Sequence, residues 1–265
     1  MHDIIETSCQ LIAKDSAAIK IVQITDTHII DDGAPSFNNY DTSASLNNVI
    51  QEIKLKEADT DLILLTGDLV HEPTDTAYQK LADHLSVITT PLYCLPGNHD
   101  DPNKMGYVMG ANGFDMSKLI RIGQWLIILL DTHLTGEHAG ELKQDELLFL
   151  SKTLEANPDS YCLIALHHHP VSINSTWMDA MSLINPEDFF NVIDEHKQIK
   201  TVIWGHIHQE FFTERNDVSF YGTPSTCLQF TPESNTFQVD NKSPAYRIII
   251  LEKTGAVDTK IKYLS

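Results

Sequence analysis

Five segments of the chain place Asp, Asn or His directly after a short aliphatic run, and such side chains are typical metal ligands. Sites in α/β sheets form just beyond the carboxyl ends of the strands, so we expect these segments to meet in one place. Imidazole and carboxylate without thiolate suit Mn, Fe, Zn or similar ions better than Ca or an iron–sulfur cluster. The set is too large for a single ion. The segments are Asp26-Thr27-His28, Gly67-Asp68, Gly97-Asn98-His99-Asp100, His167-His168-His169 and Gly205-His206-Ile207-His208.

The spacing inside these segments also favours a shared pocket. Residues i and i+2 of an extended chain point to the same side, so Asp26 can aim at one pocket with His28, and His206 with His208. Glycine stands immediately before three of the segments' polar residues, where it lets the backbone turn tightly and approach the ions. These glycines are Gly67, Gly97 and Gly205.

The elements that must position these residues follow from the pattern of apolar side chains. An apolar stripe at i, i+3, i+4 and i+7 predicts a helix over about 43–56, and similar spacing marks 78–85 and 147–154. Asn185-Pro186 is typical of an N-cap followed by proline at the first helical position. Strand and helix alternate through the first two thirds, which favours an α/β fold, and the last third is mostly β in pattern. Strands are predicted at 19–24, 61–65, 91–95, 126–130, 161–166, 201–204 and 246–251.

Composition narrows the classes of function. The 265 residues are 42% hydrophobic and 21% charged, which is typical of a folded globular protein and excludes wholesale disorder. The 18 Lys and Arg against 37 Asp and Glu give a formal charge of −19. Such acidity argues against a binder of nucleic acid or of anionic membranes. An anionic substrate would need metal ions to supply local positive charge.

The N-terminal sequence and the cysteines both bear on where the protein is expected to reside. The first six residues carry acid where a signal peptide would place a basic stretch, and the aliphatic run 125–130 is far shorter than a membrane span. We therefore expect a cytoplasmic protein whose thiols are reduced, although two disulfides are possible by count. No Cys-x-x-Cys pair is present, so a thiolate zinc site is not expected. The cysteines are Cys9, Cys94, Cys162 and Cys227.

Taken in order, the five segments match the five-motif pattern of the calcineurin-like metallophosphoesterases. The matching residues are Asp26-x-His28, Gly67-Asp68, Gly97-Asn98-His99-Asp100, His167 and Gly205-His206-x-His208. The surrounding sequence resembles a narrower group, the bacterial class III 3′,5′-cyclic-AMP phosphodiesterases, at 95–100, 165–170, 205–210 and 223–230. The resemblance spans about residues 19–251.

The resemblance implies two metal ions per chain. One would be iron and the other manganese or another divalent ion, although the ligand types do not distinguish iron, manganese, zinc and cobalt. Asp68 would bridge the two ions. The first ion would be held by Asp26, His28, Asp68 and His208, and the second by Asp68, Asn98, His167 and His206.

The resemblance also implies hydrolysis of 3′,5′-cyclic AMP to 5′-AMP by a hydroxide that bridges the two ions. His99 would act as general acid for the leaving ribose O3′. In relatives a carboxylate three residues after the bridging Asp orients this histidine. Here His71 occupies that place, which leaves Glu72 and Asp75 as candidates. The product would contact His28, Asp68, Asn98, His99 and His208.

Other residues of similar type have structural interpretations. Asp131-Thr132-His133 imitates the first motif, but the seven ligands lie elsewhere, so we interpret it as structural or loop-positioning. Of the histidine tract, His168 is expected to pack or hydrogen-bond and His169 to border the pocket. The segments 134–142 and 172–185 could form rims over the substrate. Trp177 and Phe230 could form the apolar wall that a purine needs, or could equally be packing. Histidines expected at the surface or as satisfied polar groups are His2, His84, His133, His138 and His196.

These observations predict one α/β domain over 1–265 with a core of about 19–251. Its expected fold is that of the metallophosphoesterases: two stacked mixed β-sheets flanked by helices, four layers in the order α-β-β-α. The expected partner is a cyclic nucleotide substrate, with no nucleic acid or membrane, in a monomer or a dimer. The alternatives are hydrolysis of 2′,3′-cyclic nucleotides, other diesters or monoesters at the same site. A metal-free scaffold is disfavoured because no ligand and no general acid is missing.

Overall fold

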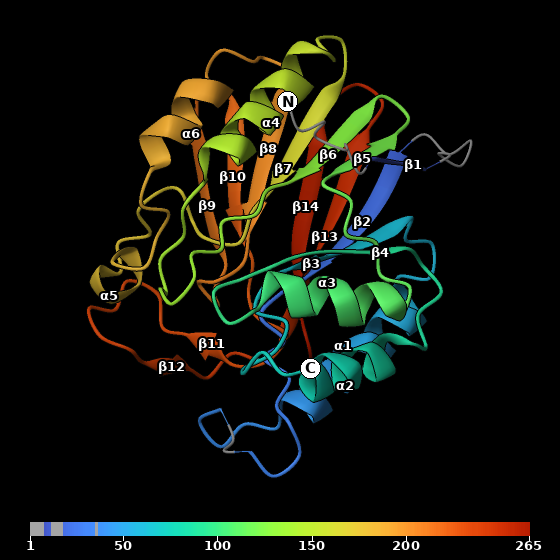
Figure 1. Ribbon diagram of the computed structural model, residues 1–265, viewed down its shortest axis with the longest axis vertical. Coiled ribbons are helices and arrows are strands. Elements are labelled where there is room, and N and C mark those ends of the chain that lie inside the picture. The colour runs from blue at the N-terminus through green and yellow to red at the C-terminus, as the bar shows by residue number, and fades with distance from the viewer. Residues whose placement is uncertain (1–7, 12–17, 35–36) are drawn as a thin grey trace.

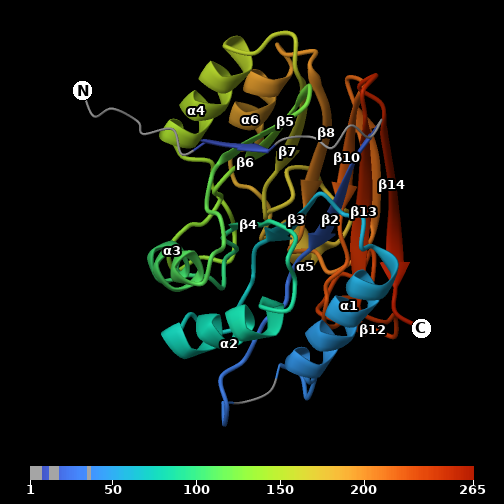
Figure 2. The same ribbon diagram turned by 90° about the vertical axis from the view of Figure 1, so that its right-hand side faces the viewer.

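The computed structural model describes residues 8–11, 18–34 and 37–265, and its framework is two β-sheets stacked face to face (Figure 1, Figure 2). One sheet has the order β1-β5-β6-β7-β8-β10-β9, the other β14-β13-β2-β3-β4, and β11 pairs with β12 alone. Each run predicted to be a strand coincides with one to within two residues. The first sheet contains β1 (Ser8–Leu11), β5 (Leu119–Ile122), β6 (Trp125–Leu129), β7 (Tyr161–Ala165), β8 (Ile199–Trp204), β9 (Phe211–Arg215) and β10 (Val218–Gly222). The others are β2 (Ala18–Ile24), β3 (Leu62–Thr66), β4 (Leu92–Leu95), β11 (Gln229–Phe230), β12 (Val239–Asp240), β13 (Ala245–Glu252) and β14 (Val257–Tyr263).

Parallel pairing brings the ends of the key strands together. In the five-stranded sheet β2, β3 and β4 run parallel, with Ile24 paired to Leu65. In the seven-stranded sheet β6, β7, β8 and β10 run parallel, with Ala165 paired to Ile203. The loops that follow β2, β3 and β4 therefore start at one edge of their sheet, and those that follow β7 and β8 start at one edge of theirs.

Helices cover the outer faces of both sheets. The helices α1 to α3 pack on the five-stranded sheet, and α4 and α6 pack on the seven-stranded sheet (Figure 1). Alternation along β3 shows the layering, because Ile63 faces the helices while Leu62 and Leu64 face the opposite sheet. The predicted four-layer α-β-β-α fold is therefore confirmed. The helices are α1 (Thr42–Lys56), α2 (Asp75–Leu85), α3 (Pro102–Ala111), α4 (Gln144–Glu155), α5 (Thr176–Asp179) and α6 (Pro186–Ile193).

Local details refine the sequence interpretation. Asn185 does occupy the N-cap position of α6, but its side chain makes no capping bond. It instead binds the backbone N–H of Leu142 at 3.0 Å and the Leu142 carbonyl at 2.9 Å, which ties α6 to the loop before α4. The four cysteines are free, as expected for reduced thiols. No helix in the described part of the chain is long and apolar enough to cross a membrane. Residue His2 lies outside the described residues.

Candidate metal centre

The five motif segments meet where the loops after β2, β3, β4, β7 and β8 converge, and two buried carboxylates lie at the centre. Asp68 Oδ2 lies 3.6 Å from His28 Nε2, and Asp68 Oδ1 lies 3.4 Å from His167 Nε2. Asp26 Oδ1 lies 3.4 Å from His208 Nε2, which in turn is 3.2 Å from His28 Nε2. The donor atoms of Asp26, His28 and His208 lie within 4.8 Å of one another, as do those of Asp26, Asp68 and His167.

The backbone at this centre adopts conformations that side chains other than glycine rarely tolerate. Asp26, His28, Asp68, His206 and His208 all have φ between 43° and 64°. Each left-handed non-glycine residue costs on the order of 1–3 kcal/mol and persists only where the surroundings hold it. Such strain at five of the predicted ligands is typical of a functional site, because the turn after each strand is what aims the side chain inward.

Two glycines permit the close approach of these loops. Gly67 has φ +90°, and a Cβ there would collide with the His167 ring and the Gly97 nitrogen. A Cβ on Gly97 would collide with the Asp68 carboxylate and with His167. Glycine was predicted at these positions to let the backbone approach the ligands closely. The structure gives the reason, because any larger residue would collide with the ligands.

Backbone carbonyls fix the orientation of the predicted histidine ligands. His167 Nδ1–H donates to the Thr66 carbonyl at 2.7 Å, and His208 Nδ1–H donates to the Leu228 carbonyl at 2.9 Å. His206 uses its other nitrogen, Nε2, for the Met181 carbonyl at 3.0 Å. The nitrogen left over on each ring is then the one available to a metal ion. Metal-binding histidines in proteins almost always have such a partner.

The donor set fits a pair of cations. Asn98 Oδ1 and His167 Nε2 are buried, yet neither makes a hydrogen bond within the described part of the chain. An unpaired buried amide oxygen and imidazole nitrogen are costly unless a ligand satisfies them. Together with two carboxylates and three further imidazoles, they supply the oxygen and nitrogen donors that borderline divalent metals prefer.

The electrostatics of the cluster favour neutral imidazole beside ionised carboxylate. Burial lowers the pKa of His28 and of His206 well below the ordinary value, so both rings are neutral and able to bind metal. Burial opposes ionisation of Asp68, yet the adjacent His167 holds the Asp68 pKa well below its usual range. Burial likewise disfavours charge on His167, but Asp68 raises its pKa to about 9. A positive charge is thus favoured next to Asp68, where a cation would replace that proton.

His99 lies at the edge of the cluster, and a backbone carbonyl orients it. Its Nδ1 lies 2.8 Å from the His71 carbonyl oxygen, and its backbone N–H donates to Asp68 Oδ1 at 2.9 Å. The expected orienting carboxylate, Glu72 or Asp75, is therefore not what holds the ring. The peptide oxygen of His71 is thus the partner of the His99 ring at Nδ1.

One residue that sequence reasoning left without a role holds the loop that carries Asn98 and His99. Asp100 is buried and accepts from the backbone N–H of Gly97 at 2.8 Å and of Leu69 at 3.2 Å. Tyr78 from α2 donates to the same carboxylate at 3.1 Å. The sequence could have indicated this role of Asp100, because it directly follows Asn98-His99 and a carboxylate at a turn commonly binds backbone N–H groups.

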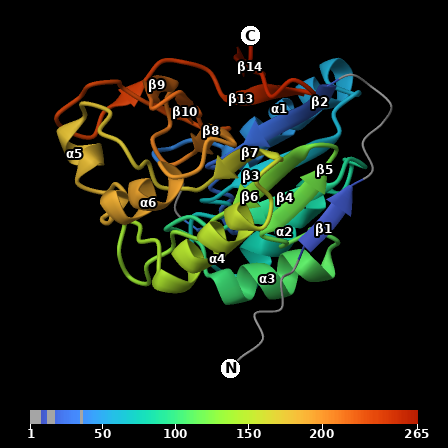
Figure 3. The same cartoon turned by 90° about the horizontal axis from the view of Figure 1, so that it is seen from above.

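An aromatic cavity of about 180 Å³ adjoins the cluster. Trp177, Phe230 and Phe237 line it, with ring centroids 5.2 Å apart for Trp177–Phe230 and 5.5 Å for Trp177–Phe237. Phe230 also stacks on His208, 4.1 Å away and nearly parallel. Phe230 therefore both lines the cavity and packs against the cluster. The aromatic residues come from α5 and from the β11–β12 segment, which lie side by side (Figure 1, Figure 3). A hydrogen bond from the Ser175 hydroxyl to the Ser234 carbonyl oxygen joins the two segments.

Several residues set aside on sequence grounds lie close to the site. His138 is exposed but lines the aromatic cavity, and its Nδ1 is 3.4 Å from Asn98 Nδ2, so it is not an ordinary surface histidine. It lies in the segment 134–142, which was predicted as a rim over the substrate, although the histidine itself was set aside. Thr132 pairs with His168 at 2.7 Å, in keeping with the structural interpretation of its segment and the expected hydrogen bond of His168. His169 lies 3.3 Å from Asp179.

The family follows from comparison with known proteins. The model of the calcineurin-like phosphoesterase family matches residues 19–210, so the chain belongs to this family. It is therefore a phosphoesterase, a hydrolase, and the predicted family is confirmed. Calcineurin-like phosphoesterases use a binuclear divalent metal centre, and the clusters of His and Asp described above are compatible with one.

Within this family, the chain is similar to several proteins named as cyclic-nucleotide phosphodiesterases. The chain is 34% identical over 249 residues to the 3′,5′-cyclic adenosine monophosphate phosphodiesterase CpdA of Haemophilus influenzae, covering 94% of this chain and 91% of the relative. It is 34% identical to CpdA of Escherichia coli K12, with the same coverages. The 3′,5′-cyclic-nucleotide phosphodiesterase alr5338 of a Nostoc species is 36% identical over 244 residues, covering 92% of each chain.

Solved structures share the fold. A dimetal phosphatase from Danio rerio superimposes with a TM-score of 0.64 at 13% identity, covering 94% of this chain and all of that one. GAP50 of Plasmodium, described as an anchor in the inner membrane complex, gives 0.63 at 11% identity, covering 94% and 85%. At such identities the likeness concerns the fold alone.

Proposed function

We propose that the protein hydrolyses 3′,5′-cyclic AMP to 5′-AMP at a binuclear metal centre. The observation that carries the proposal is the convergence around Asp68 of donor side chains from five loops, all of them buried except the partly buried Asn98. The relatives named as cyclic-nucleotide phosphodiesterases, matched along almost their whole length, support the substrate class. The charge of −19 supports a small nucleotide over a nucleic acid.

We assign the donors to two positions. One cation would be held by Asp26, His28, Asp68 and His208, and the other by Asp68, Asn98, His167 and His206, with iron and manganese or another divalent ion as the pair. When bound, the two cations would supply electrophilic charge to the phosphate and would lower the pKa of the water that acts as nucleophile. The chain's own part is to hold these donors in strained, fixed turns.

His99 is proposed as the general acid. With its Nδ1–H donated to the His71 carbonyl, the ring presents Nε2, whose proton can pass to the leaving ribose O3′. Its backbone N–H holds Asp68, so the acid and the shared carboxylate keep a constant separation. Asn98 precedes it in the same turn and would contact the phosphate. The same phosphate would touch His28, Asp68 and His208.

The aromatic cavity is proposed to receive the base. A purine needs an apolar wall, and Trp177 and Phe237 present one beside the cluster. Stacking on such rings accepts any purine, so selectivity between adenine and guanine rests on polar contacts at the rim. Cleavage of other phosphodiesters or of monoesters at the same centre is the alternative.

A substrate panel on metal-assayed protein tests the proposal. Metal content per chain is measured first, and kcat/KM is then compared for cyclic AMP, cyclic GMP, a 2′,3′-cyclic nucleotide and an aryl phosphate, with and without chelator. We expect two metals per chain, chelator-sensitive turnover, and cyclic AMP as the best substrate. A different best substrate contradicts the specificity, whereas chelator-resistant turnover contradicts the centre itself. A metal-free scaffold would show neither metal nor turnover.

A further inference from the structure

A second cavity, polar and about 640 Å³ in volume, lies next to His99. We call it the polar groove; it is lined by residues that include Glu72, Asp101, Asp131 and Lys143. Pockets for whole small molecules have volumes of about 300–1,000 Å³, so the aromatic cavity of about 180 Å³ holds only part of a ligand. The groove offers the remaining space.

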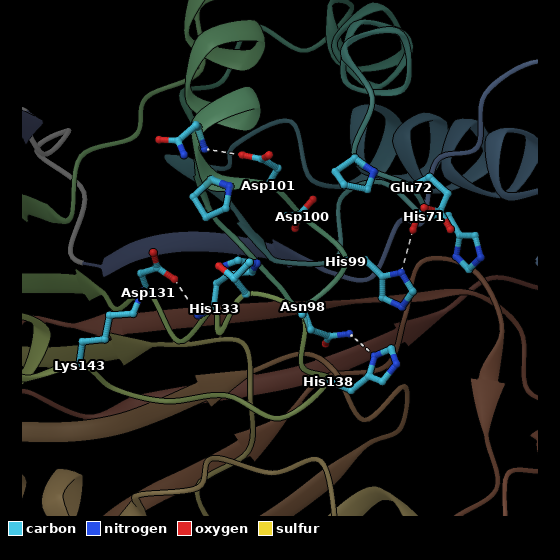
Figure 4. Close-up of a pocket in the computed structure, with 15 residues that line it drawn as sticks. His71, Glu72, Asn98, His99, Asp100, Asp101, Asp131, His133, His138 and Lys143 are labelled. Carbon is cyan, nitrogen blue, oxygen red and sulfur yellow. Dashed lines mark hydrogen bonds between the residues drawn. The ribbon is translucent and has the colours of Figure 1, made fainter.

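The two cavities meet at the residues proposed to act on the phosphate. Asn98, His99 and His138 line both of them. Figure 4 shows Asp131, His133 and Lys143 along one side of the groove, His99 and His71 on the other, and Asn98 with His138 at one end. A phosphorus atom placed at His99 therefore has an aromatic space for one ester substituent and a polar space for another.

A cyclic nucleotide uses only one of these spaces. Both of its ester oxygens belong to a single ribose, so its phosphate carries no second substituent to enter the groove. We propose that the polar groove receives the leaving alcohol of acyclic phosphodiesters, and that the enzyme also hydrolyses nucleoside 5′-phosphodiesters of small polar or cationic alcohols. This inference rests on the proposed function, because it uses the same centre and the same general acid.

Charge in the groove selects the alcohol. Among the described residues that line the groove, four carry carboxylic acids and Lys143 is the one Lys or Arg. The overall charge of −19 adds to this field. A second nucleotide or any other anionic alcohol would be repelled, whereas an alcohol that bears an ammonium group would be attracted. The carboxylates that line it are Glu72, Asp100, Asp101 and Asp131.

The step is an ordinary hydrolysis. The oxygen of water forms a new bond to phosphorus, and the bond from phosphorus to the second alcohol breaks with its electron pair left on the alcohol oxygen. That oxygen takes the proton from His99 Nε2. The water loses a proton to solvent and His99 regains one from solvent, so the products are the nucleoside 5′-monophosphate and the free alcohol.

The test compares two adenosine 5′-phosphodiesters that differ in charge but not in shape. One carries choline and the other its neutral isostere 3,3-dimethylbutanol, and the readout is the ratio of their kcat/KM values. Choline is also the better leaving group, so the ratio in the wild type is only the reference. The double variant Glu72→Gln, Asp131→Asn removes two groove charges and keeps both shapes. We expect it to lower the ratio about fivefold.

Two further readouts separate the groove from the centre. Lys143→Gln, which removes the opposing charge, should raise the same ratio about twofold. All three substitutions should leave metal content and kcat/KM for cyclic AMP unchanged. Calorimetric titration with the uncleavable phosphonates of the two diesters should show the same changes in the ratio of Kd values, so the effect is measured without turnover.

Each outcome decides the matter. A choline-to-isostere ratio that the variants do not change overturns the inference, and so does cyclic-AMP turnover that falls together with it, because the groove would then hold the cyclic substrate. Hydrolysis of cyclic AMP without hydrolysis of either acyclic diester overturns the inference and leaves the proposed function intact. The reverse pattern overturns the proposed function alone. Metal-loaded protein that cleaves neither class overturns both.

Discussion

The two sheets contribute different chemistry to the same centre. The loops after the five-stranded sheet bring both carboxylates, the amide and one imidazole, whereas the loops after the seven-stranded sheet bring imidazoles alone to the predicted ligand set. The first group is Asp26, Asp68, Asn98 and His28, and the second is His167, His206 and His208. Neutral imidazoles alone would hold a cation weakly, and the donors of the five-stranded side alone would leave each cation with fewer ligands. The difference teaches that the centre exists only where the sheets meet.

Contacts across the junction make this dependence concrete. The backbone N–H of His206 donates to both oxygens of Asp26 at 3.1 Å, and His167 lies against Asp68. Residues about 180 and 100 positions apart in the chain therefore share one cluster. Substituting a ligand from one sheet or from the other should have unequal effects on metal binding, because Asp68 binds both proposed cations and each imidazole binds one.

The largest effect is expected from Asp68→Asn. Loss of this negative charge weakens both proposed metal positions, and we expect kcat/KM for cyclic AMP to fall at least about 10⁴-fold. His167→Ala, made from the seven-stranded side, should lower the occupancy of one position only. Metal analysis of both variants at matched metal concentration provides the measurement. Equal metal loss in the two variants would contradict the proposal that Asp68 binds both cations and His167 only one.

A second prediction separates two adjacent residues of one loop. His99→Ala should keep both metals and lower kcat by about 10²–10⁴-fold, because only the proton donor is lost. Asn98→Ala should instead lower occupancy of one metal. An activated aryl leaving group needs no proton, so it should largely rescue His99→Ala. Metal loss in His99→Ala, or no rescue by the aryl ester, contradicts the general-acid role.

The aromatic wall provides a smaller effect, on substrate binding. Trp177→Ala removes one face of the cavity and should raise KM for cyclic AMP about tenfold with little change in kcat. Phe212→Ala is the matched control, since that ring is 55% exposed on β9 and does not line the cavity. Steady-state kinetics on both variants measure the difference. Equal effects of the two substitutions would mean that the base lies elsewhere.

The smallest effect concerns the anchor of α5. Burial opposes ionisation of Asp179, but His169 and the Ile173 N–H hold its pKa at about 2, below the ordinary 3.8. The native state then binds fewer protons than the unfolded state between these values, so the stabilisation is full above pH 3.8 and is lost as pH falls toward 2. Asp179→Asn should cost less than about 1 kcal/mol at pH 7, since the side chain remains partly exposed to solvent.

Urea denaturation at several pH values measures this difference. The gap between wild type and Asp179→Asn should narrow as pH falls below 4. A gap that stays the same down to pH 3 would show that the ionised form of Asp179 has no part in holding α5.

Much of the fold could be predicted because the buried strands are long enough to be read from composition alone. β2, β3 and β7 are nearly uninterrupted aliphatic runs, and each leads directly into a motif. By contrast, polar residues interrupt the four-residue strands β1 and β5, whereas the equally short β4 has no charged or amide side chain. Helix α3 carries two glycines and little apolar periodicity, so the pattern of apolar residues did not predict it.

The predicted ligands did come together, because parallel strands oblige their carboxyl ends to share an edge. What could not be predicted are partners that depend on backbone position. The His71 carbonyl that holds His99 has no side-chain signature. His138 reaches the site from a loop whose path only the packed structure determines. Side-chain type thus identified the donors, while tertiary structure decided what orients them.

The most direct test of the central claim is an anomalous-scattering map of metal-loaded crystals. Two peaks about 3.5–4 Å apart, both next to Asp68, are predicted, with the three imidazoles of the seven-stranded side divided between them. A single peak, or two peaks that share no carboxylate, would contradict the account.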